Sequence, residues 1–163
     1  MKKAALSIFL VILGGWLIST IFIDFIAAPS VFRMVSTRLE AGQLGIRLFS
    51  RFNLFEVVFG ILSICLVLIS ALRAGSKAKK FLVFSSVTLF MLSCFYQFKL
   101  TPSIVNAYDK MGPKYENGVS IEEEEKVIAS AHKIYRATDS FKILLILATI
   151  VVVINTQRKE MLS

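Results

Sequence analysis

Seven ionisable side chains lie inside or beside long apolar stretches of the sequence, where a charged group could bind a ligand or a partner. They are Asp24, Arg47, Arg51, Glu56, His132, Arg136 and Asp139. Three of them, His132, Arg136 and Asp139, are spaced i, i+4 and i+7 and therefore share one face of a helix. Arg47 and Arg51 are also one helical turn apart. Ionisable groups in apolar surroundings are costly unless paired or hydrated, so they are candidate functional residues.

Two interpretations of this set stay open. In the first, the set is a docking face or a polar pocket, and the pocket is lined by Asp24, Arg51, Glu56, His132 and Arg136. In the second, the same side chains lie at helix ends, where they reach lipid headgroups or form structural ion pairs. The interpretations differ in whether Glu56 and Arg51 share a cavity with His132.

Residue patterns for catalysis or cofactor binding are scarce. The single histidine excludes a haem held by two histidines of this chain. The sequence has no zinc-type His/Cys spacing, no glycine-rich phosphate loop and no serine or cysteine nucleophile with an obvious helper. We therefore expect no enzymatic activity, no catalytic residue, no metal site and no cofactor.

The elements that must position these side chains are membrane-spanning helices. Of the 163 residues, 56% are hydrophobic and 18% charged, and the mean hydropathy is +0.72. A helix needs about 20 apolar residues to cross a bilayer. Apolar windows of that kind predict spans at about residues 4–28, 52–72, 81–100 and 138–155. We expect an all-α membrane protein, residues 1–163 forming one domain, with the four helices in an antiparallel bundle.

Two prolines are predicted to end the first and third spans. Residues 24–31 and 97–104 are similar, with Phe, Pro and Ser in register. Because a proline disfavours helix in the residue before it, we predict helix breaks at Pro29 and Pro102. Gly112, Pro113 and Gly118 predict a loop over residues 109–118.

Two further helices are predicted outside the spans. After Pro29, an amphipathic helix at the membrane interface is indicated by one apolar stripe, made of Val35, Leu39, Gly42, Ile46 and Phe49. Before the fourth span, a long helix over residues 121–154 is expected to extend out of the membrane, since it would be about 50 Å long.

The charge distribution predicts the orientation and the surroundings. The net charge is +8. With four spans, both termini and the linker 73–80 lie on one side, and these short segments hold eight Lys/Arg against one acid. Short basic loops favour the cytoplasmic side, so we expect both termini there. The basic residues suit a lipid bilayer surface, and no nucleic-acid-binding module is visible.

Several segments together resemble the transmembrane protein 205-like family, whose bacterial branch is called domain of unknown function 4149. The matching segments are Gly15-Trp16, Ala28-Pro29-Ser30-Val31-Phe32, Ala41-Gly42, Arg47-Leu48-Phe49, Leu100-Thr101-Pro102 and His132-Lys133-Ile134-Tyr135. The resemblance implies a four-span helical fold and leaves the biochemical role undefined. The bacterial branch implies the inner, or cytoplasmic, membrane.

Two functional hypotheses follow from the small size and the absence of catalytic patterns. The first is a non-enzymatic accessory or assembly subunit, whose polar face docks onto other membrane protein subunits or a second copy of the chain. The alternative is a small carrier or resistance protein for a metal, a drug or a small anion.

Overall fold

The computed structural model describes residues 2–70 and 76–162, and throughout these ranges the secondary structure is helical, with no strand. Four helical stretches are long and apolar enough to cross a membrane: Ala4–Met34, Leu39–Ile69, Lys77–Glu116 and Glu122–Lys159. The prediction of an all-α protein with four candidate membrane helices is thus confirmed. The last two residues of the second predicted span, 71 and 72, lie outside the described residues.

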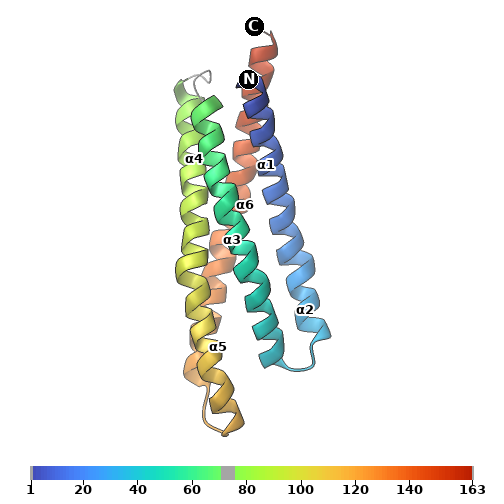
Figure 1. Cartoon of the computed structure of the whole chain (residues 1–163), viewed down its shortest axis with the longest axis vertical. Helices are drawn as coiled ribbons and strands as arrows, with labels where there is room; N and C mark the ends of the chain where they lie inside the picture. The colour runs from blue at the N-terminus through green and yellow to red at the C-terminus, as the bar shows by residue number, and fades with distance from the viewer. Residues whose placement is uncertain (1, 71–75, 163) are drawn as a thin grey trace.

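Eight elements make up the four stretches. In chain order they are α1 (Lys2–Phe22), the π-helical turn η1 (Ile23–Ala27), α2 (Ala28–Met34), α3 (Arg38–Ser70), α4 (Ser76–Phe95), the π-helical turn η2 (Tyr96–Leu100), α5 (Thr101–Glu116) and α6 (Glu122–Leu162). Figure 1 places both chain ends at one end of the molecule, and the α2–α3 and α5–α6 turns at the other. The α5–α6 hairpin extends beyond the α2–α3 turn.

The predicted helix breaks at Pro29 and Pro102 are wrong, because the chain stays helical through both prolines. Each proline follows a five-residue π-turn at the same offset, and the N–H groups of Ala28 and Thr101 bond to carbonyls five residues earlier. A proline removes one helical hydrogen bond and its ring crowds the preceding turn, which a locally wider turn can accommodate. The hydroxyl of Ser30 donates to the carbonyl of Ile26 at 2.6 Å. The sequence similarity of residues 24–31 and 97–104 thus corresponds to a repeated helix distortion.

Two other local predictions differ from the structure. The segment after Pro29 divides at residues 35–37, and its second part is continuous with the membrane helix α3. The predicted loop over residues 109–118 is helical up to Glu116, because α5 includes Pro113 and ends at a turn containing Gly118, whose φ is +63°. The long helix leading into the fourth span is confirmed: α6 has 41 residues.

A layer of charged and polar residues separates two apolar parts of the bundle core. The core nearer the termini is formed by nine fully buried side chains: Leu6, Phe9, Leu13, Trp16, Val67, Leu82, Leu89, Ile146 and Val153. At the other end, Tyr108 and Met111 of α5 pack against Ile128 of α6. Between them lie the buried Asn53, Glu56, Asp139 and Lys142. The positions of these four residues define the candidate site.

Small residues bring the helices close enough to bury this layer. A Cβ atom added at Gly60 of α3 would lie 3.0 Å from the Cα of Phe90 on α4, so the two backbones touch at this point. The buried hydroxyls of Ser85, Ser93, Thr149 and Thr156 donate to carbonyls of their own helices. Small residues of this kind permit close packing of membrane helices.

Candidate functional site

A fully buried ion pair lies at the centre of the polar layer. The Nζ of Lys142 on α6 donates to Oε1 of Glu56 on α3 at 2.6 Å, and both side chains have no solvent exposure. The same carboxylate oxygen accepts the indole N–H of Trp16 on α1 at 2.9 Å. The hydroxyl of Thr20, one turn further along α1, lies 3.4 Å from it. Donors from two helices therefore converge on one oxygen of Glu56.

Lys142 is enclosed by groups that stabilise a positive charge. It forms a second ion pair with Asp139, three residues earlier on α6. Its Nζ also lies 5.1 Å from the ring centroid of Tyr96 and 5.8 Å from that of Phe52. The faces of aromatic rings attract cations at such distances. Two carboxylates and two rings thus hold the ammonium group of Lys142 inside the bundle.

A third carboxyl group joins this cluster from the first helical stretch. Asp24 lies in η1, is half-buried, and lines the same cavity as Asp139. Asp24 is the acidic residue of this widened turn. Glu56 and Asp139 thus form ion pairs with Lys142, and Asp24 adds a third carboxyl group at the cavity beside Asp139. We call these four residues the charged cluster.

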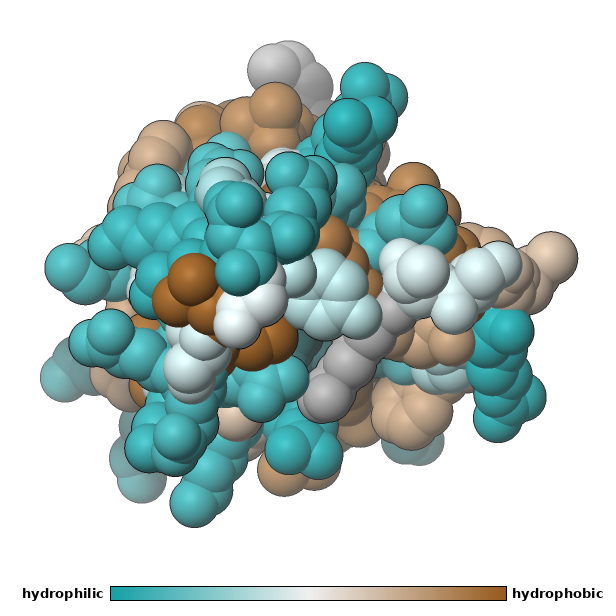
Figure 2. All heavy atoms as spheres, turned by 90° about the horizontal axis from the view of Figure 1, so that it is seen from below, coloured by the Kyte–Doolittle hydropathy of each residue, from teal (hydrophilic) through white to brown (hydrophobic). Residues whose placement is uncertain are grey.

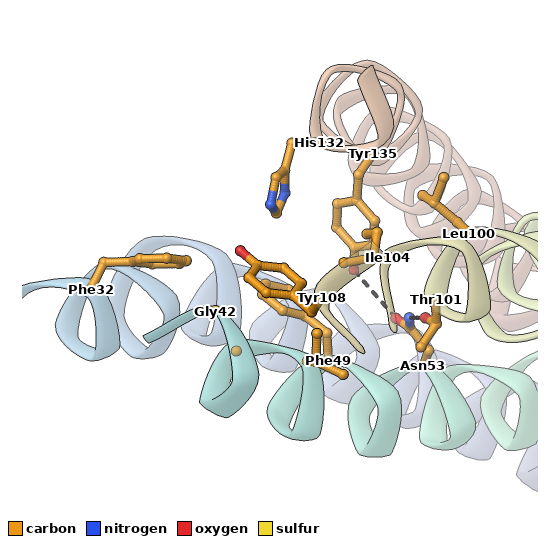
Figure 3. Close-up of a pocket in the computed structure, with 12 residues that line it drawn as sticks. Phe32, Gly42, Phe49, Asn53, Leu100, Thr101, Ile104, Tyr108, His132 and Tyr135 are labelled. Atoms are coloured by element: carbon orange, nitrogen blue, oxygen red, sulfur yellow. Dashed lines mark hydrogen bonds between the residues drawn. The ribbon is translucent and has the colours of Figure 1, made fainter. Parts of the chain in front are cut away.

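Three adjoining cavities lead from the end of the molecule opposite the termini toward the charged cluster. The first, of about 50 Å³, lies between α3, α5 and α6 (Figure 3). Two larger, partly open ones of about 390 and 370 Å³ follow α6. Phe32 of α2 and His132 of α6 line all three. We call the two larger cavities together the groove.

The small cavity has a polar floor and aromatic walls. Figure 3 shows Asn53 at its floor, donating to the hydroxyl of Thr101 at 2.9 Å and accepting from the hydroxyl of Tyr135 at 3.3 Å. The hydroxyl end of Tyr108 is directed toward His132. Tyr108 can lie over α3 because residue 42 is glycine: a Cβ there would be 2.3 Å from the tyrosine ring. These hydrogen bonds tie α3, α5 and α6 together beside the groove.

The groove ends at the charged cluster. Asp24, His132, Arg136 and Asp139 all line its inner cavity. Phe25, Phe32, Phe49 and Tyr135 add aromatic surface to the same cavity. The outer cavity shares His132 and Arg136 and continues along α6 toward Glu125. Figure 2, seen from this end, has hydrophilic residues over much of the surface. The groove therefore connects a polar end of the molecule with buried charge.

The structure unites five of the seven residues that the sequence singled out. Four of them, Asp24, His132, Arg136 and Asp139, line the groove. The fifth, Glu56, is connected to Asp139 by Lys142, which forms an ion pair with each of the two. Arg47 and Arg51 differ: both are exposed, and neither lines any of the three cavities. Glu56 itself is a member of the buried cluster and does not line the groove.

Three central residues were missed by the charge pattern. The sequence does contain a feature that points to Lys142. It directly precedes a stretch of fifteen residues without a charge, 143–157, and a buried Glu56 needs a basic partner. Trp16 and Thr20 carry no charge, and their part in binding Glu56 depends on how α1 faces α3. Within the described residues, no group of three or more His, Cys, Asp or Glu is placed to hold a metal ion.

A family model described as domain of unknown function (DUF4149) matches residues 11–113. The matched region contains Trp16, Asp24 and Glu56, while Asp139 and Lys142 follow it in the chain. Neither the curated proteins nor the solved structures include a match to this sequence.

Proposed function

The chain belongs to the family described as domain of unknown function (DUF4149), and we propose that it is a small, non-enzymatic membrane carrier that binds a solute in the groove. The observation that carries this proposal is the continuity of the groove with the charged cluster: Asp24 and Asp139 are members of both. Buried charge is costly in a membrane helix bundle, and it commonly marks a solute or proton pathway. The motifs quoted above extend this proposal to a wider kinship with the transmembrane protein 205-like family.

The composition of the groove suits a small molecule that is partly apolar. Binding sites of this kind combine mostly apolar and aromatic walls with a few polar groups that orient the ligand. Here Phe25, Phe32 and Phe49 supply apolar walls, while Asp24 and Arg136 supply charge of both signs. A cavity of about 370 Å³ is within the range of small-molecule sites.

The test compares two ions of nearly equal size and shape and opposite charge, tetraphenylphosphonium and tetraphenylborate. Protein purified in mild detergent is heated with each ion, and unfolding is followed by circular dichroism. We expect at least one ion to raise the unfolding temperature, because a ligand that binds the folded state stabilises it. Ser140→Trp, which places a large ring in the inner cavity, is expected to abolish the rise.

The matched control is Ala137→Trp, on an exposed position of the same helix outside the three cavities. This variant is expected to retain the full temperature rise. If neither ion stabilises the wild-type protein, or if both tryptophan variants behave alike, the groove is not a solute site and the proposal is wrong.

For the membrane orientation we propose the inner membrane, with both termini cytoplasmic. The support is the density of basic residues in the termini and the linker 73–80. The groove then opens on the outer side. Green fluorescent protein fused after Ser163 is expected to fluoresce, because it becomes fluorescent on the cytoplasmic side. Alkaline phosphatase at the same site is expected to be inactive, because it becomes active only on the outer side. The reverse pattern would contradict this orientation.

An accessory or assembly subunit is the second candidate function. The observation that favours it is the α5–α6 hairpin, which extends beyond the rest of the bundle (Figure 1). The ion pair between Lys114 and Glu124, at 2.7 Å, joins its two helices. Native purification in mild detergent is expected to recover another membrane subunit or a second copy bound to the chain. Recovery of the monomer alone would exclude this function.

A further inference from the structure

The groove is open along one side of the bundle. α1 packs against α6, but its continuation does not: within the described residues, the backbones of η1 and α2 make no close approach to α6. In Figure 1 the first helical stretch diverges from α5 and α6 toward its α2 end. Phe25 and Phe32 line the groove from η1 and α2, yet they are 70% and 47% exposed. The aromatic edge of the groove is therefore part of the outer surface of the bundle.

The opening lies at the depth where lipid headgroups begin. Asp24 is about 20 residues from Ala4, the start of the first stretch, and Arg136 is about 23 residues from Lys159, the end of the fourth. At about 1.5 Å per residue, both are roughly one hydrocarbon thickness away from the membrane side of the termini. They consequently meet the headgroups of the opposite leaflet.

These two residues present opposite charges to the opening. Asp24 is half-buried, Arg136 is exposed, and both line the inner cavity of the groove. In the part of the chain that the structure describes, neither takes part in an ion pair. Lys142, by contrast, is fully buried and already paired with two carboxylates. A ligand in the groove thus finds one carboxylate and one guanidinium group that it can reach.

Resting on the carrier function above, we propose that the solute is a zwitterionic phospholipid, phosphatidylethanolamine, from the leaflet opposite the termini. Its ammonium group donates to the carboxylate of Asp24, and the guanidinium group of Arg136 donates to its phosphate. Guanidinium groups match the oxygens of phosphate well. The acyl chains leave the groove through the open side. Ile143, which lines the same cavity one helical turn beyond Asp139, lies on the hydrocarbon side of the charges and contacts these chains.

The charges favour this headgroup over one with a single charge. A lipid with a phosphate and no cation would satisfy Arg136 and bring a like charge to Asp24. A cationic lipid without phosphate would satisfy Asp24 and bring a like charge to Arg136. The rings of Phe25, Phe32 and Phe49 provide apolar surface for a lipid and also attract an ammonium group.

Native mass spectrometry tests the preference for the headgroup. Protein in mild detergent is mixed with equal amounts of phosphatidylethanolamine, phosphatidylglycerol and a trimethylammonium lipid without phosphate, all with the same acyl chains. We expect phosphatidylethanolamine to bind about tenfold more tightly than either of the others, which corresponds to one hydrogen bond to a charged group. Equal binding of all three lipids would overturn the proposal.

Two variants are expected to lose different parts of this preference. Asp24→Asn should bind phosphatidylglycerol as well as phosphatidylethanolamine, because the ammonium group has lost its carboxylate. Arg136→Gln should bind the trimethylammonium lipid as well as phosphatidylethanolamine, because the phosphate has lost its guanidinium group. Asp109→Asn and Lys133→Gln, at exposed charges outside the three cavities, are the matched controls and should keep both preferences. If Asp24→Asn and Arg136→Gln keep them too, the headgroup does not bind here.

A water-soluble competitor identifies the source of the headgroup. Glycerophosphoethanolamine has the same charges without acyl chains, and it is expected to displace phosphatidylethanolamine only at far higher concentration. Equal affinity for the two would mean that the ligand comes from water, and the lipid assignment would be wrong.

The outcomes separate this inference from the carrier function itself. If a tetraphenyl ion stabilises the protein but the lipids show no preference, the groove remains a solute site and the lipid proposal fails. If neither ion stabilises it and phosphatidylethanolamine still binds through Asp24 and Arg136, the carrier function fails and the lipid site stands.

Discussion

Replacing Lys142 by methionine is expected to destabilise the protein by about 3–5 kcal/mol, the usual cost of removing one partner of a buried ion pair. Lys142 is the common partner of Glu56 and Asp139. Without it, the two buried carboxylates of Glu56 and Asp139 lose the ammonium group that pairs with both of them. The free energy of unfolding is measured by titration with sodium dodecyl sulfate in mixed micelles, followed by circular dichroism.

Two companion variants identify the cause of this loss. Glu56→Gln is expected to cost only about 1.5–3 kcal/mol, the value of a hydrogen bond to a charged group. The amide oxygen of the glutamine can still accept from Trp16, and Lys142 retains its ion pair with Asp139. The double variant Glu56→Gln with Lys142→Met is expected to be more stable than Lys142→Met alone. The carboxylate left unpaired in the single variant is absent from the double one.

The control for Lys142 is Lys126→Met. Lys126 forms an ion pair with Glu122 at 2.7 Å, close in length to the buried pair, but both side chains are about three-quarters exposed. Exposed pairs contribute little to stability, so this variant is expected to unfold at nearly the wild-type detergent concentration. If Lys126→Met and Lys142→Met had equal effects, the buried cluster would not be what stabilises the bundle.

Replacing Trp16 is expected to have the second largest effect. Its side chain is fully buried, packs 5.8 Å from the ring centroid of Phe59, and donates to Glu56. Trp16→Ala is expected to cost about 3–5 kcal/mol through the cavity it leaves. Trp16→Phe retains most of the volume and loses the N–H donor, so its expected cost is about 1.5–3 kcal/mol. The same unfolding titration measures both.

The comparison for Trp16 is a large aromatic residue on the outer surface. Phe84 of α4 is 64% exposed, and Phe84→Ala is expected to change stability far less than Trp16→Ala. Adding Glu56→Gln to Trp16→Phe is expected to cost less than the two single changes summed, because Glu56→Gln weakens the hydrogen bond from Trp16 by removing the charge of its acceptor and Trp16→Phe removes the same bond altogether. Strict additivity of the two changes would contradict a direct bond between Trp16 and Glu56.

Local signals in the sequence were sufficient for the helices and for much of the candidate site. A run of about 20 apolar residues predicts a membrane helix because the bilayer leaves the backbone no other way to satisfy its hydrogen bonds. Charges inside such runs are conspicuous, which is why Asp24, Glu56 and Asp139 were recognised. The two prolines, in contrast, predict helix breaks at Pro29 and Pro102, and this prediction is wrong because a π-turn before each proline lets the helix continue.

The sequence by itself determined that this protein has four apolar helices and that a few charges are embedded in them. Only the tertiary structure decided which charges meet. The rotation of α6 turns Lys142 toward Glu56 and Asp139, whereas Arg47 and Arg51 on α3 face outward. Rotation and register of a helix depend on packing with residues far away in the chain, such as Trp16 on α1 and Tyr96 in η2. The physical reason is that hydropathy acts residue by residue, while an ion pair requires two distant helices to present matching faces at one depth.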